Sequence, residues 1–574
     1  MRKLKLFTLG LGSILLASCV SNPDTGSSLI DSNGGGKEGY ISQKALSVEE
    51  LGEGFNARYL PDVQNIKQRS GTIDVALDFY GNQYGWEKVA REYERLQSHQ
   101  VKVNINTNYS GSTYSQKIQS EMQNSKTDWD ICEGNLGERY TNSSCLHITS
   151  ISNQNNEYCG RDVPWTSVLE DEAFTSIENH STDTYIINSE VMQTCWFVNK
   201  TALDKAGEQG YKNANGEIGN PVTWDDLISL CDYMVKAGYE NPLGISLTDG
   251  SIHSTQYTWL TRIYGDYYYR QFYPYAMSAS YWDNYDPTQK DPELNDGYGV
   301  KFCKIANIML AEGDKCKLPC GFQGPGSDLY KDLISQLYKM RDYIVADSTS
   351  LEFQALRDQF RLQNKGTKSA QILLDYLGNG CVYSSSDAID LDYFDYPEMK
   401  NSYVTDGSIT RDIGGNGGFL SIIKHPGNAN QNNLNIDFMK FFMSPYGQTL
   451  YYQGLAEHDI APMGLSTVKN KYIVIPEKWT KFFQEANQKV SFNGNVDGNI
   501  FISWGGRFFS QYQNTEAIIV ENTRRLLLKT IGSSAMSVDE YISAWKEACF
   551  KDYKLKCQEC QWPETMYLDP TLPY

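Results

Sequence analysis

The sequence predicts an α/β protein with at least two lobes. Apolar residues alternate along 73–79 and 101–105, as in half-buried strands, and recur at helical spacing along 86–96 and 114–122. Residues 129–132 begin a third short strand. This β-α-β-α-β order requires parallel strands joined by helical crossovers. More than 500 residues follow the N-terminal region of this 574-residue chain, which is more than a single domain usually holds.

Capping residues mark further helices along the chain. Thr223 stands three residues before Asp226, the spacing of a capping box at the start of a helix. Ser537 precedes Glu540 with the same spacing, and a short amphipathic helix is expected along 435–443, where the Ser-Pro pair at 444–445 stops it. These residues place helices and carry no chemistry.

The first 19 residues have the plan of a secretory signal. Arg2, Lys3 and Lys5 precede an apolar run along 6–16, which is shorter than the roughly 20 residues that span a bilayer. The small residues before Cys19 resemble the lipobox of bacterial lipoproteins. This resemblance implies that Cys19 becomes the lipid-modified N-terminus, so that the lipid alone holds the protein at the outer side of the cell membrane. An ordinary signal peptide followed by a chance cysteine is the alternative.

Composition narrows the class of partner. Residues 20–50 are assigned to a flexible tether, because 21–40 are rich in Ser, Gly, Asn and Asp. Without the three basic residues of the signal, the formal charge of −19 becomes −22. This charge argues against nucleic acid or an anionic membrane surface as a partner, and an acidic face that keeps an exported protein soluble accounts for it.

Aromatic residues are abundant, with 40 Tyr and 11 Trp. Twelve of the 29 residues along 257–285 are aromatic, and they are mixed with Asp, Arg and Asn. Flat rings with a polar edge suit ligands that carry both hydroxyl groups and C–H faces, as sugars do. We expect part of this segment to face a ligand, although ordinary core packing accounts for much of the Tyr content.

Twelve cysteines remain after Cys19, and an oxidising compartment makes several disulfides an expectation. Cys557 and Cys560 lack a nearby second pair or His, so we interpret them as a structural disulfide and not as a zinc or redox site. The six His residues are scattered, and no cofactor or metal is expected. The chain has no H-E-x-x-H, G-x-S-x-G or P-loop sequence, and the glycines along 414–418 lack the spacing of a dinucleotide site.

Three loops, 80–84, 109–113 and 133–136, follow the predicted strands at their carboxyl ends, where parallel sheets bind ligands. The ligand-contacting residues predicted in this lobe are Tyr80, Asn82, Gln83, Tyr84, Glu133 and Asn135. For Asn82, Glu133 and Asn135 the alternative is turn capping or solvent exposure.

A series of segments carries a resemblance to a known family. The segments, in chain order, are 80–84, 86–94, 114–118, 128–131, a Gly-Asn-Leu-Gly loop at 134–137, Trp-Phe-Val-Asn-Lys at 196–200, Pro-Val-Thr-Trp-Asp at 221–225, Gly-Gly-Phe at 417–419, and 442–448. Together they resemble the extracellular solute-binding proteins of family 1, the sugar-binding lipoproteins of ABC importers. The chain departs from the family in its length, with insertions near 140–185, 264–300 and 310–350. These insertions bear on the identity of the ligand more than on the fold.

The resemblance implies a type II periplasmic-binding-protein fold, in which two α/β lobes close on a central cleft by a hinge motion. The expected division is 70–188 plus 380–443 for one lobe and 189–379 plus 444–550 for the other, followed by a tail at 551–574. By position, the resemblance adds Trp259, Asn416, Gly417 and Trp504 to the ligand contacts. Core packing is the alternative for the two Trp residues.

The function implied by the resemblance is capture of a carbohydrate, an oligosaccharide above all, and its delivery by a monomer to ABC permease subunits. A lipid-anchored secreted carbohydrate-active enzyme is the alternative. Glycosidases need two carboxyl groups about 5–10 Å apart, which no linear motif reveals. The same fold could instead bind a peptide or polyamine, or serve as a receptor for a sensor kinase.

Overall fold

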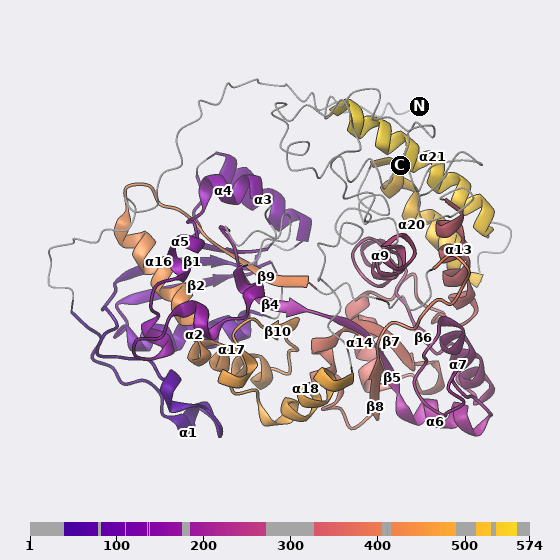
Figure 1. Cartoon of the computed structure of the whole chain (residues 1–574), viewed down its shortest axis with the longest axis horizontal. Helices are drawn as coiled ribbons and strands as arrows, with labels where there is room; N and C mark the ends of the chain where they lie inside the picture. Colours follow the sequence, from indigo (N-terminus) through magenta and orange to yellow (C-terminus); the bar gives the residue numbers. More distant parts are fainter. Residues whose placement is uncertain are drawn as a thin grey trace, which may run out of the picture.

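The strands form two sheets that lie side by side (Figure 1). The computed structural model describes residues 39–78, 82–108, 111–124, 126–134, 136, 138–174, 184–270, 327–404, 410, 415–489, 513–529 and 535–559. We call the six-stranded sheet and the helices packed on it lobe 1, and the four-stranded sheet with its helices lobe 2. Cys19, Tyr80, Asn135 and Trp504 lie outside the described residues.

The sheet of lobe 1 has the strand order β10-β4-β9-β3-β1-β2. Its strands are β1 (Gly71–Ala76), β2 (Val101–Asn106), β3 (Ile131–Glu133), β4 (Ile187–Met192), β9 (Gly415–Ile422) and β10 (Gly464–Ser466). β1 pairs in parallel with β2 and β3, which confirms the order predicted from the sequence. β9 pairs antiparallel with both β3 and β4, so β3 and β4 run in the same direction.

The sheet of lobe 2 has the strand order β6-β7-β5-β8. Its strands are β5 (Thr194–Asn199), β6 (Leu243–Gly244), β7 (Ile372–Tyr376) and β8 (Leu391–Phe394). β7 is parallel to β6 and antiparallel to β5, which itself pairs antiparallel with β8. All six residues of β5 are buried, as expected of a strand covered on both faces.

Helices cover both sheets. In lobe 1 they are α1 (Val48–Leu51), α2 (Gln83–Leu96), α3 (Gly111–Gln123), α4 (Glu138–Ser144), α5 (Thr149–Ser152), α16 (Ala429–Phe442) and α17 (Pro445–Glu457). In lobe 2 they are α6 (Lys200–Glu208), α7 (Trp224–Lys236), α8 (Asp249–Ser254), α9 (Gln256–Tyr269), α13 (Ser327–Tyr338), α14 (Phe353–Leu362), α15 (Gly380–Tyr383), α18 (Glu477–Lys489), α20 (Gln513–Leu527) and α21 (Val538–Glu559). The apolar stripe predicted along 86–96 is the buried face of α2. The predicted capping box of α7 is present, since Thr223 and Asp226 each accept the backbone N–H of the other.

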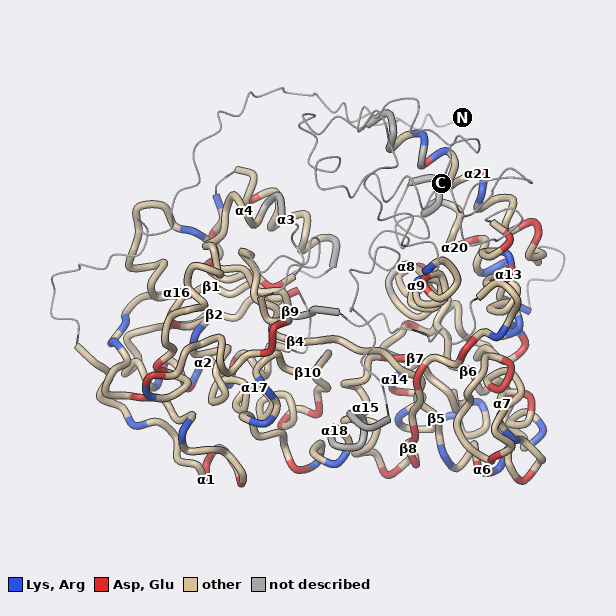
Figure 2. The backbone as a smooth tube through the Cα atoms, viewed as in Figure 1, with Lys and Arg blue, Asp and Glu red and all other residues tan. Residues whose placement is uncertain are grey.

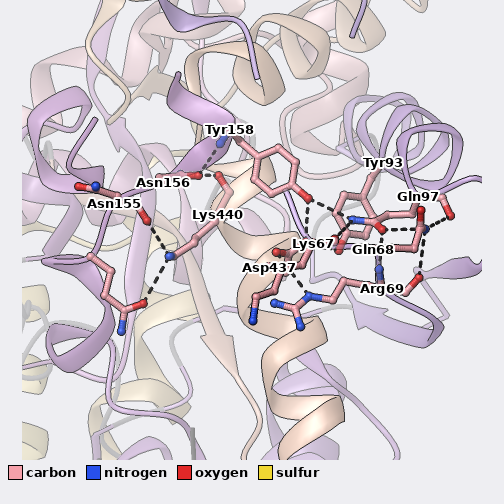
Figure 3. Close-up of polar contacts among 11 residues, drawn as sticks. Lys67, Gln68, Arg69, Tyr93, Gln97, Asn155, Asn156, Tyr158, Asp437 and Lys440 are labelled. Carbon is pink, nitrogen blue, oxygen red and sulfur yellow. Dashed lines mark hydrogen bonds and ion pairs between the residues drawn. The ribbon is translucent and has the colours of Figure 1, made fainter. Parts of the chain in front are cut away.

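The residues before β1 belong to the folded lobe, which corrects the predicted tether at 20–50 from residue 39 onward. Ile41 and Leu51 are buried, and Arg69 lies beside the carboxylate of Asp437 on α16, with 3.6 Å between Nε and Oδ1. The hydroxyl groups of Tyr93 and Tyr158 donate to the same carboxylate at 2.8 and 2.7 Å (Figure 3). This network joins the N-terminal segment, α2 and α16 into one body.

The predicted lobe boundaries need three corrections. β8, in the range 380–443 assigned to the first lobe, pairs with β5 in lobe 2. α17 and β10, in the range 444–550 assigned to the second lobe, belong to lobe 1, because α17 packs on α2 and β10 pairs with β4. α21 also runs through the predicted start of the tail and ends at Glu559.

Two local features explain why α17 packs on lobe 1. Ser444 does not only end the preceding helix: its side chain accepts the Gly447 N–H and caps α17. Glycines then let α17 approach α2, since a Cβ on Gly454 would lie 2.5 Å from the carbonyl oxygen of Tyr84.

Five of the cysteines that the structure describes are not paired in disulfides. Cys132, Cys145, Cys159, Cys231 and Cys381 are buried free thiols. Burial raises the pKa of the Cys132 and Cys159 thiols well above its ordinary value, as expected of cysteines that serve as small apolar residues. The predicted Cys557–Cys560 pair lies outside the side chains that the structure describes. None of the described helices has both the length and the apolar character needed to cross a bilayer.

Candidate ligand-binding site

The carboxyl ends of strands from both sheets meet where the chain crosses between the lobes. β4 ends at Met192, and after Gln193 the chain continues as β5 of lobe 2. Tyr376, the last residue of β7, pairs with Thr194, and the N–H of Leu377 donates to the Gln193 carbonyl oxygen at 2.8 Å. Since β1 and β3 run parallel to β4, their carboxyl ends lie at the same edge of the lobe 1 sheet. Ligands of α/β sheets bind at such edges.

Two of the predicted residues of lobe 1 lie together at this edge. The Nδ2 group of Asn82, in the loop after β1, lies 3.5 Å from Oε1 of Glu133 at the end of β3. The other carboxyl oxygen of Glu133 accepts the backbone N–H of Asp78 at 3.2 Å. Asn82 is 5% exposed and Glu133 2% exposed. The carboxylate of Glu133 therefore ties together the loops after β1 and β3.

Gln83 and Tyr84 begin α2, and the structure places them differently. Gln83 is buried. The ring of Tyr84 stacks on His458 at the end of α17, with 3.9 Å between ring centroids and 13° between planes. Tyr84 thus contributes to the packing of α2 against α17, and a contact between Tyr84 and a ligand remains a prediction.

β9 places the predicted residues Asn416 and Gly417 beside β4. Gly417 pairs in register with Glu190 on β4, and Asn416 pairs with Val191. The side chain of Asn416 lies outside the described residues. The next residue, Gly418, has φ +56°, and a Cβ there would lie 2.0 Å from Oγ of Ser189. Glycine is favoured here because the backbone is left-handed and a side chain would meet the Ser189 hydroxyl group.

Glu190 is the residue that sequence reasoning missed. Its side chain is 3% exposed, and its carboxyl group accepts the Tyr451 hydroxyl at 3.2 Å and the Gly464 N–H at 3.1 Å. Burial raises its pKa to about 8, and the neighbouring charge of Glu133 contributes to the shift. Figure 2 shows acidic residues in the region of the β4 and β9 labels, on the side of lobe 1 that faces lobe 2. The only signal in the sequence is a carboxylate within a short strand.

Lobe 2 presents aromatic rings at the carboxyl end of β7. Trp259 on α9 lies 4.8 Å from the ring of Tyr376 and 5.7 Å from that of Phe353, measured between centroids. Trp259 is 3% exposed, so its ring is embedded among these neighbours. One turn further along α9, burial lowers the pKa of Arg262 to about 10. Trp259 is therefore placed at the expected edge and is also a packing residue.

The carboxyl ends of the strands thus carry hydrogen-bonding groups in lobe 1 and packed aromatic rings in lobe 2. Among the described residues, no three His, Cys, Asp or Glu side chains are grouped as ligands for a metal ion.

Comparisons with known proteins support the fold. No protein-family model matches the sequence, and no curated protein matches it either. The chain is similar in structure to a chitin oligosaccharide binding protein, with a TM-score of 0.51 and 14% identity over 84% of this chain and 99% of the other. A structure from a study of xylan utilization by the thermophilic bacterium Caldanaerobius polysaccharolyticus gives the same TM-score and identity over 83% and 99% of the two chains. The predicted two-lobed fold of the solute-binding proteins is confirmed.

Proposed function

We propose that this protein is an extracytoplasmic solute-binding protein that captures an oligosaccharide and delivers it unaltered to an ABC import permease. The observation that carries the proposal is that each lobe brings a different kind of side chain to the carboxyl ends of its strands, on either side of the crossing between the lobes. Asn82 and Glu133 lie at the edge of one sheet, and Trp259 and Tyr376 lie at the edge of the other. Sugars need both kinds of surface, since their hydroxyl groups require partners and their C–H faces favour rings.

The shared fold supports this assignment. One structural neighbour is, by its name, a chitin oligosaccharide binding protein, and the alignment covers 99% of its chain. The permease as a partner, a monomeric state and the absence of catalysis follow from the resemblance found in the sequence. In this fold two lobes close on the ligand, and differential contacts with both lobes supply the driving force.

A screen of neutral sugars tests the proposal. Chitotetraose, xylotetraose, mannobiose and raffinose are added to the purified protein, and its melting temperature is measured. A ligand at 100 times its dissociation constant adds about 2.7 kcal/mol to the unfolding free energy. We expect at least one sugar to stabilise the protein and to be recovered intact by mass spectrometry. Recovery of cleaved sugar would instead support a carbohydrate-active enzyme. Peptides and polyamines are screened in the same way, and stabilisation by these compounds alone would support the same fold with a ligand that is not a sugar.

The proposed location is the outer face of the cell membrane, with a lipid on Cys19. The described fold begins at residue 39, which leaves about 20 residues between the lipid and lobe 1. Metabolic labelling with palmitate tests this part: the wild type takes up label, and Cys19→Ser does not. Cys132→Ser is the matched control, because this buried thiol has no role in anchoring and its variant keeps the label.

A further inference from the structure

In the sheet of lobe 2, β7 extends beyond the end of its partner β6. The two strands pair in parallel at Leu243 with Ile372 and at Gly244 with Leu373, where β6 ends. β7 continues from there to Tyr376 along β5. The backbone groups that follow these pairs need other partners, because buried backbone groups are almost always hydrogen-bonded.

The side chain of Gln256, the first residue of α9, supplies such partners. Its Nε2 group donates to the carbonyl oxygen of Gly244 at 2.8 Å and to that of Leu374 at 2.9 Å. Its Oε1 atom accepts the backbone N–H of Ser246 at 2.8 Å. Gln256 is 0% exposed. The N–H groups and the oxygen of this buried amide are thus bonded to β7, to β6 and to the segment that follows β6.

These directional bonds fix the first turn of α9. An amide is costly to bury unless its groups are bonded, whereas an apolar side chain would pack a helix on a sheet without that cost. The N–H of Trp259 donates to the Thr255 carbonyl oxygen at 2.9 Å within this turn. Trp259 stands three residues after Gln256, so the two side chains are neighbours on one face of the helix. A shift of Gln256 would therefore move the ring of Trp259 relative to Tyr376, from which it lies 4.8 Å between ring centroids.

We propose that Gln256 is a positioning residue for ligand binding: its amide fixes the first turn of α9 across β6 and β7 and so holds the ring of Trp259 at the carboxyl end of β7, where this ring contacts the captured sugar. The effect on sugar binding rests on the proposed function, whereas the effect on the placement of Trp259 does not.

The first test compares two buried glutamines. Gln256→Met keeps the length of the side chain and removes its hydrogen bonds. We expect the dissociation constants of chitotetraose and xylotetraose to rise about threefold to tenfold, the size of one ring contact.

Gln97→Met is the matched control. Gln97 is 0% exposed, accepts the N–H of Arg69 at 2.7 Å and donates to the carbonyl oxygen of Lys67 at 3.3 Å, in lobe 1 at the end of α2 (Figure 3). Both variants leave buried backbone groups unpaired and should lose stability, but only Gln256→Met should bind sugar more weakly. Equal weakening in both would reflect general destabilisation and overturn the role of Gln256.

A double-mutant cycle tests whether Gln256 acts through Trp259. Part of the contribution of the indole ring is already lost in Trp259→Phe, so Gln256→Met should weaken binding less in that background than in the wild type. Fully additive losses would mean that Gln256 affects binding by another route and would contradict a positioning role.

A milder variant keeps the proposal testable if Gln256→Met does not fold. Gln256→Glu keeps the acceptor for Ser246, and while protonated it still donates one hydrogen bond. Relative to the wild type at the same pH, its affinity should be near-native at pH 5 and weaker at pH 8. Native affinity at both pH values would count against the role of Gln256.

Fluorine NMR tests the placement of Trp259 without any ligand. The tryptophans are replaced by 5-fluorotryptophan, and the resonance of Trp259 is the one that is missing in Trp259→Phe. We expect this resonance to shift in Gln256→Met and to stay unchanged in Gln97→Met. If neither sugar binds to the wild type, the proposed function fails and this resonance decides on the placement of Trp259. If sugars bind equally to the wild type and Gln256→Met, the role of Gln256 is overturned while the proposed function stands.

Discussion

Glu190 in lobe 1 and Asp375 in lobe 2 are both buried acids on strands that meet the crossing between the lobes. Asp375 accepts two hydrogen bonds from the guanidinium group of Arg357, at 2.9 and 2.6 Å, and a third from the Tyr383 hydroxyl. Within the described part of the chain, Glu190 accepts hydrogen bonds from two neutral donors and from no cation. Asp375 therefore has a cation beside it in lobe 2, whereas burial and the neighbouring Glu133 raise the pKa of Glu190 in lobe 1. The two lobes support the crossing by different means, with a buried ion pair in lobe 2 and an acid held by neutral donors in lobe 1.

The largest effect is expected when the ion pair between Asp375 and Arg357 in lobe 2 is broken. Asp375→Asn removes the charge that balances Arg357, and an unpaired buried charge costs about 3–5 kcal/mol. We expect urea unfolding to show a loss of stability of this size. Asp204→Asn is the control, because the ion pair of Asp204 with Lys200 is half exposed and such pairs contribute about 1 kcal/mol or less. A loss below about 1 kcal/mol in Asp375→Asn would remove the distinction between the two lobes.

The second prediction concerns the pH dependence of stability that Glu190 contributes in lobe 1. The pKa of Glu190 is raised from 4.5 to about 8 in the native protein, so between these values the native state holds a proton that the unfolded chain has released. Stability must then fall as the pH rises through this window, by at most about 1.4 kcal/mol per pH unit. In Glu190→Gln this component is absent. The measurement is the difference in unfolding free energy between wild type and variant from pH 4.5 to pH 9, and parallel curves would contradict the prediction.

How much of the fold and of the candidate site could be predicted from the sequence depends on how far apart along the chain the contacting residues lie. The order β1-α2-β2-α3-β3 follows from local periodicity, and Asn82 and Glu133 meet because both follow parallel strands. The partners of Glu190 lie 261 and 274 residues away, and no local pattern predicts that α17 and β10 return to lobe 1. The same long return explains the errors in the lobe boundaries.

The third effect tests the hydrogen-bonding side of the joint between the lobes. Asn82→Ala removes the side-chain donor that lies 3.5 Å from Glu133 and leaves that carboxylate one partner short. Sugar affinity should fall by about 1–3 kcal/mol, measured by calorimetric titration. Asn104→Ala is the matched control, because Asn104 is an exposed residue of β2 that bonds Asp74 and should leave affinity unchanged. Equal losses in both variants would remove Asn82 from the site.

The smallest effect tests the aromatic side. Alanine at position 259 would remove a buried indole, which costs about 3–5 kcal/mol of stability and hides any effect on binding. Trp259→Phe keeps a ring against Tyr376 and Phe353, so we expect near-native stability and an affinity loss of about 0.5–1.5 kcal/mol. Trp165→Phe reverses the pattern, since Trp165 in lobe 1 donates to the Met443 carbonyl oxygen at 3.0 Å. That variant should lose stability and keep its affinity for sugar. If Trp259→Phe also keeps full affinity, this ring supports the fold of lobe 2 and does not touch the ligand.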